Sequence, residues 1–196
     1  AGEGGALVTD DEELAKSFRR WKFHGLGVDA FDRNNRGRAP QAEVQEPGFK
    51  YNLTDMQAAL AIGQFRRLEE INGKREKLAL RYLELLKGVE GVEPLKMPSG
   101  YDFKHAWHLF IVRVTTDKMT RTEFMDKLKA KNIGTGLHFV AAHIQKYYRE
   151  VMGFQRGMLP ETEYNSDRIC SLPLFPGMTF ADQDDVVQAI KEVLAE

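Results

Sequence analysis

Apolar residues recur along the chain with two kinds of spacing, one typical of helices and the other of strands. Leu14, Phe18 and Trp21 lie three or four residues apart after Asp10 and Asp11, which predicts an amphipathic helix that begins at these aspartates. Further helices are expected at residues 120–131, 162–168 and 180–194. Short apolar runs predict strands at residues 4–9, 105–114, 133–139 and 170–174. Helices and strands therefore alternate, which indicates an α/β fold.

A long helix is expected at residues 54–87, where apolar residues stay in step with a helical period. Thr54 and Gln57 form a capping-box pattern at its start, because each side chain can bond the other's backbone amide. Asn72 and Gly73 interrupt the pattern, and a glycine costs up to about 1 kcal/mol inside a helix. We therefore expect a long connector that bends or breaks at this pair.

The composition is that of a globular chain with nearly balanced charges, so any basic binding site must be local. The 196 residues are 42% hydrophobic and carry a formal net charge of -1, so nothing demands a nucleic acid or an anionic membrane as a partner. No apolar run approaches the roughly 18 residues of a membrane helix. The single cysteine, Cys170, excludes an internal disulfide framework and is expected as a buried strand residue. These features favour a cytoplasmic protein.

The start of the long helix has the chemistry of an anion site. Lys50 and Asn52 stand just before Thr54, beside helix amides that lack an intrahelical acceptor. A phosphate-binding corner is one interpretation. The other is a plain capped helix with a solvated lysine, and position alone does not decide between them.

Two further stretches carry candidate chemistry. The long loop at residues 28–47 is basic through Arg33, Arg36 and Arg38, which suits a subunit contact, an anion or a solvated loop. The end of the expected strand at 133–139 gathers aromatic and imidazole rings, a grouping typical of a ligand site: His138, Phe139, His143, Tyr147 and Tyr148. His105 and His108 are an odd number of residues apart in an expected strand, so they face opposite sides and no metal site is assigned.

Several stretches together resemble one family, the pyridoxal-phosphate-dependent sugar-nucleotide aminotransferases of the DegT/DnrJ type. The matching stretches span nearly the whole chain: residues 3–5 (EGG), 22–25 (KFHG), 51–59 (YNLTDMQAA), 136–139 (GLHF) and 172–176 (LPLFP). Residues 23–29 (FHGLGVD) and 37–43 (GRAPQAE) resemble the branch that aminates a UDP-4-keto-pentose on the route to 4-amino-4-deoxy-L-arabinose, in lipid A modification and polymyxin resistance.

The resemblance implies the C-terminal part of a fold-type-I, aspartate-aminotransferase-like enzyme. Residues 1–53 would end the large domain and carry a dimer loop, 54–87 would be the connector helix, and 88–196 would form a small α+β domain with a roughly three-stranded sheet. The Schiff-base lysine is expected upstream of Ala1, so no residue of this chain is assigned as catalytic. The family also implies a homodimer that takes a UDP-sugar and glutamate or 2-oxoglutarate.

The resemblance also assigns binding roles. Lys50, Asn52 and Arg38 would hold the phosphate of pyridoxal 5'-phosphate in the neighbouring subunit. His138, Phe139 and His143 would contact the substrate. Many members show Gly-aromatic-Asn-aromatic-Arg where this chain has glycine, phenylalanine, lysine, tyrosine and asparagine at residues 48–52, so cation and amide are exchanged.

Two alternatives stay open at this point. Some relatives have a histidine in place of the Schiff-base lysine and act as sugar dehydratases. A stand-alone binding or assembly module without catalysis is the third interpretation, because the nucleophile is not among these residues.

Overall fold

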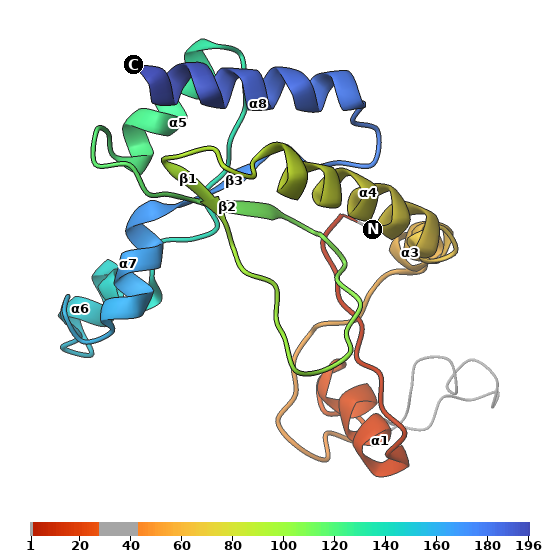
Figure 1. Cartoon of the computed structure of the whole chain (residues 1–196). Coiled ribbons are helices and arrows are strands. Elements are labelled where there is room, and N and C mark those ends of the chain that lie inside the picture. Colours follow the sequence, from red (N-terminus) through yellow and green to blue (C-terminus); the bar gives the residue numbers. More distant parts are fainter. Residues whose placement is uncertain (1, 28–42) are drawn as a thin grey trace. The chain divides into compact units, whose positions relative to one another are not determined.

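The computed structural model describes residues 2–27 and 43–196, in two compact units that comprise residues 1–67 and 68–196 (Figure 1). The first unit contains helices α1 (Glu12–Trp21) and α3 (Asp55–Phe65). The second unit contains, in chain order, α4 (Leu68–Leu85), β1 (Val92–Pro94), β2 (Phe110–Val114), α5 (Arg121–Ala130), the 3-10 turn η1 (Ala142–Ile144), α6 (Lys146–Glu150), α7 (Pro160–Arg168), β3 (Ile169–Leu172) and α8 (Phe180–Ala195).

The predicted first helix is confirmed, whereas the predicted strand at residues 4–9 is wrong. Asp11 caps α1, and its carboxylate accepts from the Leu14 amide at 2.9 Å. Residues 4–9 have no regular secondary structure, because a strand needs a hydrogen-bonded neighbour and none of the described residues pairs with them. Leu7 and Val8 are consequently exposed.

The capping box at the start of the long helix is confirmed, but the position of the helix break is not. The Thr54 hydroxyl accepts from the Gln57 amide at 3.3 Å, and the Gln57 side chain accepts from the Thr54 amide at 3.2 Å. Helix α3 ends at Phe65, and α4 begins at Leu68 and continues through Asn72 and Gly73. Good helix formers on both sides outweigh the cost of this glycine. No helix-breaking residue stands at 66–67, so the sequence carries no signal for the boundary.

The second unit is built on a three-stranded antiparallel sheet in the order β1-β2-β3. Val92 pairs with Val114, and Val112 pairs with Cys170. Phe110, Val112 and Val114 alternate with less buried residues, so one face of β2 is fully covered. The expectation of a small domain with a roughly three-stranded sheet is confirmed.

The membership of the sheet differs from the prediction. Residues 133–139 form only an isolated bridge, Gly136 to Ser171, instead of a strand. The third strand is β1, at residues for which the apolar pattern predicted no strand. Pro94 is compatible with this short strand because β1 lies at the sheet edge, where a missing amide does no harm. The strand expected at 105–114 is shorter and begins at Phe110.

Helices α4, α5 and α8 supply the core that covers the buried face of the sheet (Figure 1). Tyr82 from α4, Phe124 from α5 and Ile190 from α8 are completely buried in it. The Tyr82 hydroxyl donates to the Pro173 carbonyl at 3.0 Å, and burial raises the pKa of this phenol. The three-part division at residues 53 and 87 stays a prediction, but α4 contributes directly to the core of the second unit.

Helices α5, α7 and α8 agree with the helices predicted at residues 120–131, 162–168 and 180–194. Helices α5 and α8 both begin with complete capping boxes, at Thr120 with Glu123 and at Thr179 with Asp182. Helix α7 begins with Pro160 at its first position, where a missing amide has no cost. The first unit differs from the second, because no large apolar side chain is buried among its described residues.

Candidate functional site

The first candidate site, residues 48–54, is held in an extended conformation against the end of α1. The Phe49 amide donates to the Trp21 carbonyl at 2.7 Å, and the Tyr51 amide donates to the Lys22 carbonyl at 2.8 Å. In the other direction, the His24 amide donates to the Phe49 carbonyl at 2.8 Å. Residues 22–25 and 51–54, which both carry the family resemblance, are therefore parts of one local structure.

Glu46 fastens the chain that leads into this segment. Its carboxylate accepts from Arg20 Nε at 2.6 Å and from Trp21 Nε1 at 2.5 Å. These hydrogen bonds, that from Arg20 first, lower the pKa of Glu46. The Glu46 carboxylate is thus bound to two side chains of α1, and its negative charge is paired with Arg20.

Two glycines allow the backbones to approach closely at the same point. A Cβ atom on Gly48 would lie 2.0 Å from the Gly25 nitrogen, and one on Gly25 would lie 1.7 Å from the Glu46 carbonyl oxygen. Gly25 also has a φ of 70°, which side chains disfavour. Both positions therefore require glycine for the segment to lie where it does.

Lys50 and Asn52 lie on one side of the segment. Side chains alternate along an extended chain, and the rings of Phe49 and Tyr51 stack on the other side, with centroids 4.9 Å apart and planes 5° from parallel. Lys50 Nζ rests 4.1 Å from the centroid of the Phe23 ring, a contact that leaves its N–H groups able to donate. No hydrogen bond to the Asn52 amide is recorded within the described residues. A cation and an amide donor are thus exposed side by side.

The capped start of α3 follows directly after these two residues. The first amides of a helix point away from its body without an intrahelical acceptor, and the helix dipole favours an anion there. Lys50, Asn52 and this helix end together have the donors and charge that a phosphate group needs. Arg38, the third residue expected at the cofactor phosphate, lies outside the described residues, as do Arg33 and Arg36.

The second candidate site, residues 136–145, lies beside α7 and β3. The His138 Nδ1 atom lies 2.9 Å from the Ser171 hydroxyl oxygen. Phe139 next to it is 75% exposed, so its ring is free to meet a ligand. These are the first two of the three residues expected to contact the substrate.

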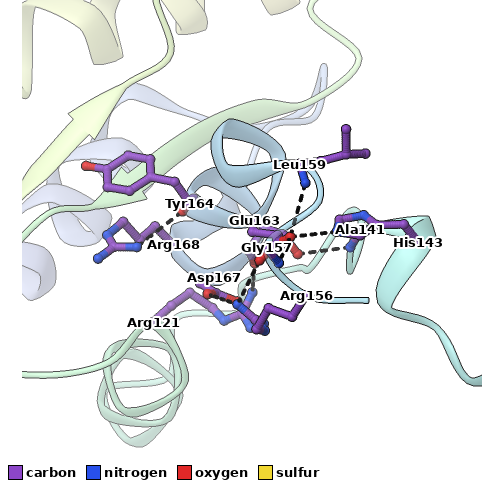
Figure 2. Close-up of polar contacts among 11 residues, drawn as sticks. Arg121, Ala141, His143, Arg156, Gly157, Leu159, Glu163, Tyr164, Asp167 and Arg168 are labelled. Atoms are coloured by element: carbon purple, nitrogen blue, oxygen red, sulfur yellow. Dashed lines mark hydrogen bonds and ion pairs between the residues drawn. The ribbon is translucent and has the colours of Figure 1, made fainter. Parts of the chain in front are cut away.

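His143, the third, is buried instead of exposed. Its Nε2 atom lies 2.9 Å from Glu163 Oε1, as Figure 2 shows. Beside it, the Ala141 amide donates to the Ser166 hydroxyl at 2.9 Å. Direct substrate contact by His143 stays a prediction, and its observed contact fixes residues 141–143 to α7.

Glu163 is the centre of the polar network in Figure 2. Its Oε1 atom also accepts from the Gly157 amide at 2.7 Å and from the Leu159 amide at 3.3 Å. The hydrogen bond from His143 first, and then those from the two amides, lower the pKa of this carboxyl group. One carboxylate therefore joins residues 141–143, the turn before α7, and α7 itself.

Arg156 and Asp167 close the same network at the surface. The two guanidinium nitrogens Nη1 and Nη2 donate to the two Asp167 oxygens at 2.8 and 3.0 Å. This bidentate pair lowers the pKa of Asp167. It ties the turn at residues 154–159 to the far end of α7.

Ser171, Ser166 and Glu163 are residues of the second candidate site that the sequence did not reveal. Each lies 20 to 33 positions from the residue that it binds, and none belongs to a spacing pattern. The predicted group of aromatic and imidazole rings is only partly assembled, because His143 is buried while Tyr147 is 62% exposed. Tyr148 stacks on Phe154, with ring centroids 6.2 Å apart.

The structure gives a different account of His105 and His108 from the predicted one. Both precede β2, so strand alternation does not govern them, and His105 Nδ1 accepts from the Trp107 amide at 2.9 Å. Within residues 2–27 and 43–196 there is no group of three His, Cys, Asp or Glu side chains that could hold a metal ion. Across the same residues, no helix combines the length and apolar character that crossing a membrane requires. Cys170 is buried in β3 as expected.

With this geometry established, the chain can be assigned to a class: it belongs to the DegT/DnrJ/EryC1/StrS aminotransferase family, whose sequence profile matches residues 1–191. A curated relative, UDP-4-amino-4-deoxy-L-arabinose--oxoglutarate aminotransferase from Shewanella sediminis (strain HAW-EB3), is 54% identical over 198 residues. That alignment covers 98% of this chain and 51% of the relative, so this chain spans about half of that protein's length.

Solved structures agree with this assignment. DesV from S. venezuelae, in complex with a ketimine intermediate, is 29% identical with a TM-score of 0.77, and the match covers 94% of this chain and 45% of DesV. NtdA from Bacillus subtilis, with bound cofactor PMP, is 26% identical with a TM-score of 0.75, over 96% of this chain and 41% of NtdA. The predicted fold, a part of an aminotransferase of this family, is confirmed.

Proposed function

We propose that this chain is part of an aminotransferase that moves an amino group from glutamate to the 4-keto carbon of a UDP-linked sugar, on the 4-amino-4-deoxy-L-arabinose route to lipid A modification. Family membership and the 54% identical relative support the reaction class and the substrate. The observation that carries the proposal is the paired exposure of Lys50 and Asn52 beside the capped start of α3, because it matches the chemistry of a cofactor phosphate.

Pyridoxal 5'-phosphate is the cofactor in this proposal. When bound, it supplies the electron-withdrawing ring on which amino transfer depends. Lys50 contributes a positive charge and N–H donors to the phosphate, and Asn52 contributes a neutral amide donor. Arg38 belongs to the same set in the proposal. No lysine of this chain is assigned as the catalytic Schiff-base lysine.

His138 and Phe139 form the substrate-binding part of the proposal. The imidazole offers a polar atom to the sugar nucleotide, and the exposed Phe139 ring offers an apolar surface to a sugar or a base. His143 supports these two residues indirectly, because its contact with Glu163 fixes residues 141–143 to α7. This arrangement fits a site that recognises its ligand by shape and by a small number of polar contacts.

A cytoplasmic homodimer is the proposed assembly, with the phosphate of one subunit's cofactor bound by Lys50 and Asn52 of the other. The exposed apolar side chains of the first unit support a contact with another subunit. Met56 and Phe65 both lie on the apolar helix α3 and are 82% and 75% exposed. Exposed apolar side chains of this kind mark surfaces that bind another protein.

The experiment supplies the intact native protein with pyridoxal phosphate, ¹⁵N-labelled glutamate and a UDP-4-keto-pentose, and follows the sugar nucleotide by mass spectrometry. We expect glutamate-dependent incorporation of one labelled nitrogen, and omission of glutamate is the control. Loss of a hydroxyl group without nitrogen incorporation would indicate a dehydratase, and binding without any turnover would indicate a binding module. Either result overturns the proposed reaction.

A further inference from the structure

The His138 ring is fixed from two directions by residues that have no assigned role. Its Nδ1 atom lies 2.9 Å from Ser171 Oγ, and the ring folds back over Gly136. A Cβ atom on Gly136 would lie 2.6 Å from His138 Cε1, closer than van der Waals contact permits. A β carbon at residue 136 would therefore displace the ring from the position in which it meets Ser171.

Ser171 is itself held rigidly. Its amide donates to the Gly136 carbonyl at 2.7 Å, and its carbonyl accepts from the Gly136 amide at 3.0 Å. The residue lies in β3 and is 5% exposed. The backbone of Ser171 is therefore fixed next to Gly136, and its hydroxyl oxygen is held by the contact with His138.

This geometry selects between the two neutral forms of His138. If Nδ1 carried the proton, it would donate to Ser171, and the buried hydroxyl hydrogen would need another acceptor. The structure records no other partner for this hydroxyl among the described residues. A buried donor without an acceptor is costly, so the hydroxyl donates to an unprotonated Nδ1. The ring proton then lies on Nε2.

We propose that Ser171 and Gly136 are positioning residues that hold His138 in the Nε2–H form, so that it donates a hydrogen bond to an oxygen atom of the sugar-nucleotide substrate. This inference rests on the proposed function, because it takes His138 as a substrate contact. It adds to that function the direction of the hydrogen bond and the two residues that set it. Hydroxyl, carbonyl and phosphate oxygens are the acceptors of this class.

The direct test is the His138 tautomer in the intact protein, without cofactor or substrate, read from long-range ¹H–¹⁵N correlations in alkaline solution. In the wild type we expect an unprotonated Nδ1 and a protonated Nε2. Free neutral histidine already favours the Nε2–H form, so Ser171→Ala and Gly136→Ala should each move the two ring ¹⁵N shifts from a single tautomer toward the free-histidine mixture, and Ser171→Thr should not. Gly134→Ala is the matched control, because a Cβ atom there meets nothing within 4 Å.

A kinetic measurement accompanies the spectroscopic one. Ser171→Ala and Gly136→Ala should raise KM for the sugar nucleotide about 3- to 10-fold with little change in kcat, the effect of one weakened neutral hydrogen bond. A protonated Nδ1 in the wild type, or an unchanged tautomer in both variants, overturns the inference. Because the spectra need no turnover, this outcome is independent of whether amination is observed.

Discussion

His143 Nε2 and Glu163 Oε1 lie 2.9 Å apart, with side chains that are only 6% and 9% exposed. The same carboxylate oxygen accepts two backbone amides from the turn before α7. The pKa of Glu163 is lowered in the folded protein, so folding is favoured by its ionised form. Its contribution to stability is present above its ordinary pKa of 4.5 and is lost as the pH falls through the lower folded value.

We predict that Glu163→Gln lowers the melting temperature at neutral pH and that this difference shrinks as the pH falls below 4.5. In that range the Glu163 carboxyl of the wild type becomes protonated and neutral. The two proteins then both lack the negative charge, so their melting temperatures approach each other. Melting curves of both proteins at a series of pH values provide the measurement. Glu161→Gln is the matched control, because Glu161 lies two residues earlier on α7 and is exposed. A difference that stays constant with pH contradicts an ionised role for Glu163.

Gly48→Ala should destabilise the first unit and weaken binding of pyridoxal phosphate. The added Cβ atom would lie 2.0 Å from the Gly25 nitrogen, a backbone atom that cannot rotate away. The strand-like contact that presents Lys50 and Asn52 must then open. Protease sensitivity of residues 43–53 and cofactor retention report this change.

Gly63→Ala gives the comparison for that prediction. A Cβ atom on Gly63 meets nothing within 4 Å, and the residue lies inside α3, where alanine is favoured by up to about 1 kcal/mol. This variant should retain cofactor as well as the wild type does. Equal behaviour of the two alanine variants would argue against the close approach at Gly25.

Cys170 should be nearly inert in the folded protein. Burial raises the pKa of its thiol from 9.0 to about 11, so at pH 8 the thiolate is about 100-fold scarcer than in an unfolded chain. A coloured disulfide reagent should therefore label the protein slowly until denaturant is added. Rapid labelling of the native protein would mean that β3 opens readily.

The parts of the fold that sequence predicted are those set by near neighbours. The capping box of Thr54 and Gln57 involves residues three positions apart, and periodic apolar residues define α1 and α8. The strand expected at 133–139 was wrong because strand formation depends on a partner elsewhere in the chain. Residues 133–139 make only a single bridge to β3, from Gly136 to Ser171. The third strand of the sheet is instead β1, three residues that pair with the other edge of β2.

The candidate site divides in the same way. Lys50 and Asn52 could be proposed from the sequence because they adjoin a local helix start and a family motif. Ser171 and Glu163 were not found, because serine and glutamate are common and their partners lie 33 and 20 residues away. The burial of His143 was also not predictable, since it depends on packing against α7.

The central claim is that Lys50 and Asn52 bind the phosphate of the cofactor, and the most direct measurement is the dissociation constant of pyridoxal phosphate for the intact protein and its Lys50→Ala, Asn52→Ala double variant. The lost charge-assisted and neutral hydrogen bonds, together about 2 kcal/mol, should weaken binding about 30-fold. Lys16→Ala removes another exposed lysine from the same unit, one that lies 2.8 Å from Glu13, and should leave binding unchanged. Affinity for pyridoxal, which lacks the phosphate, should be similar in all three proteins. An unchanged dissociation constant for pyridoxal phosphate in the double variant would contradict the claim.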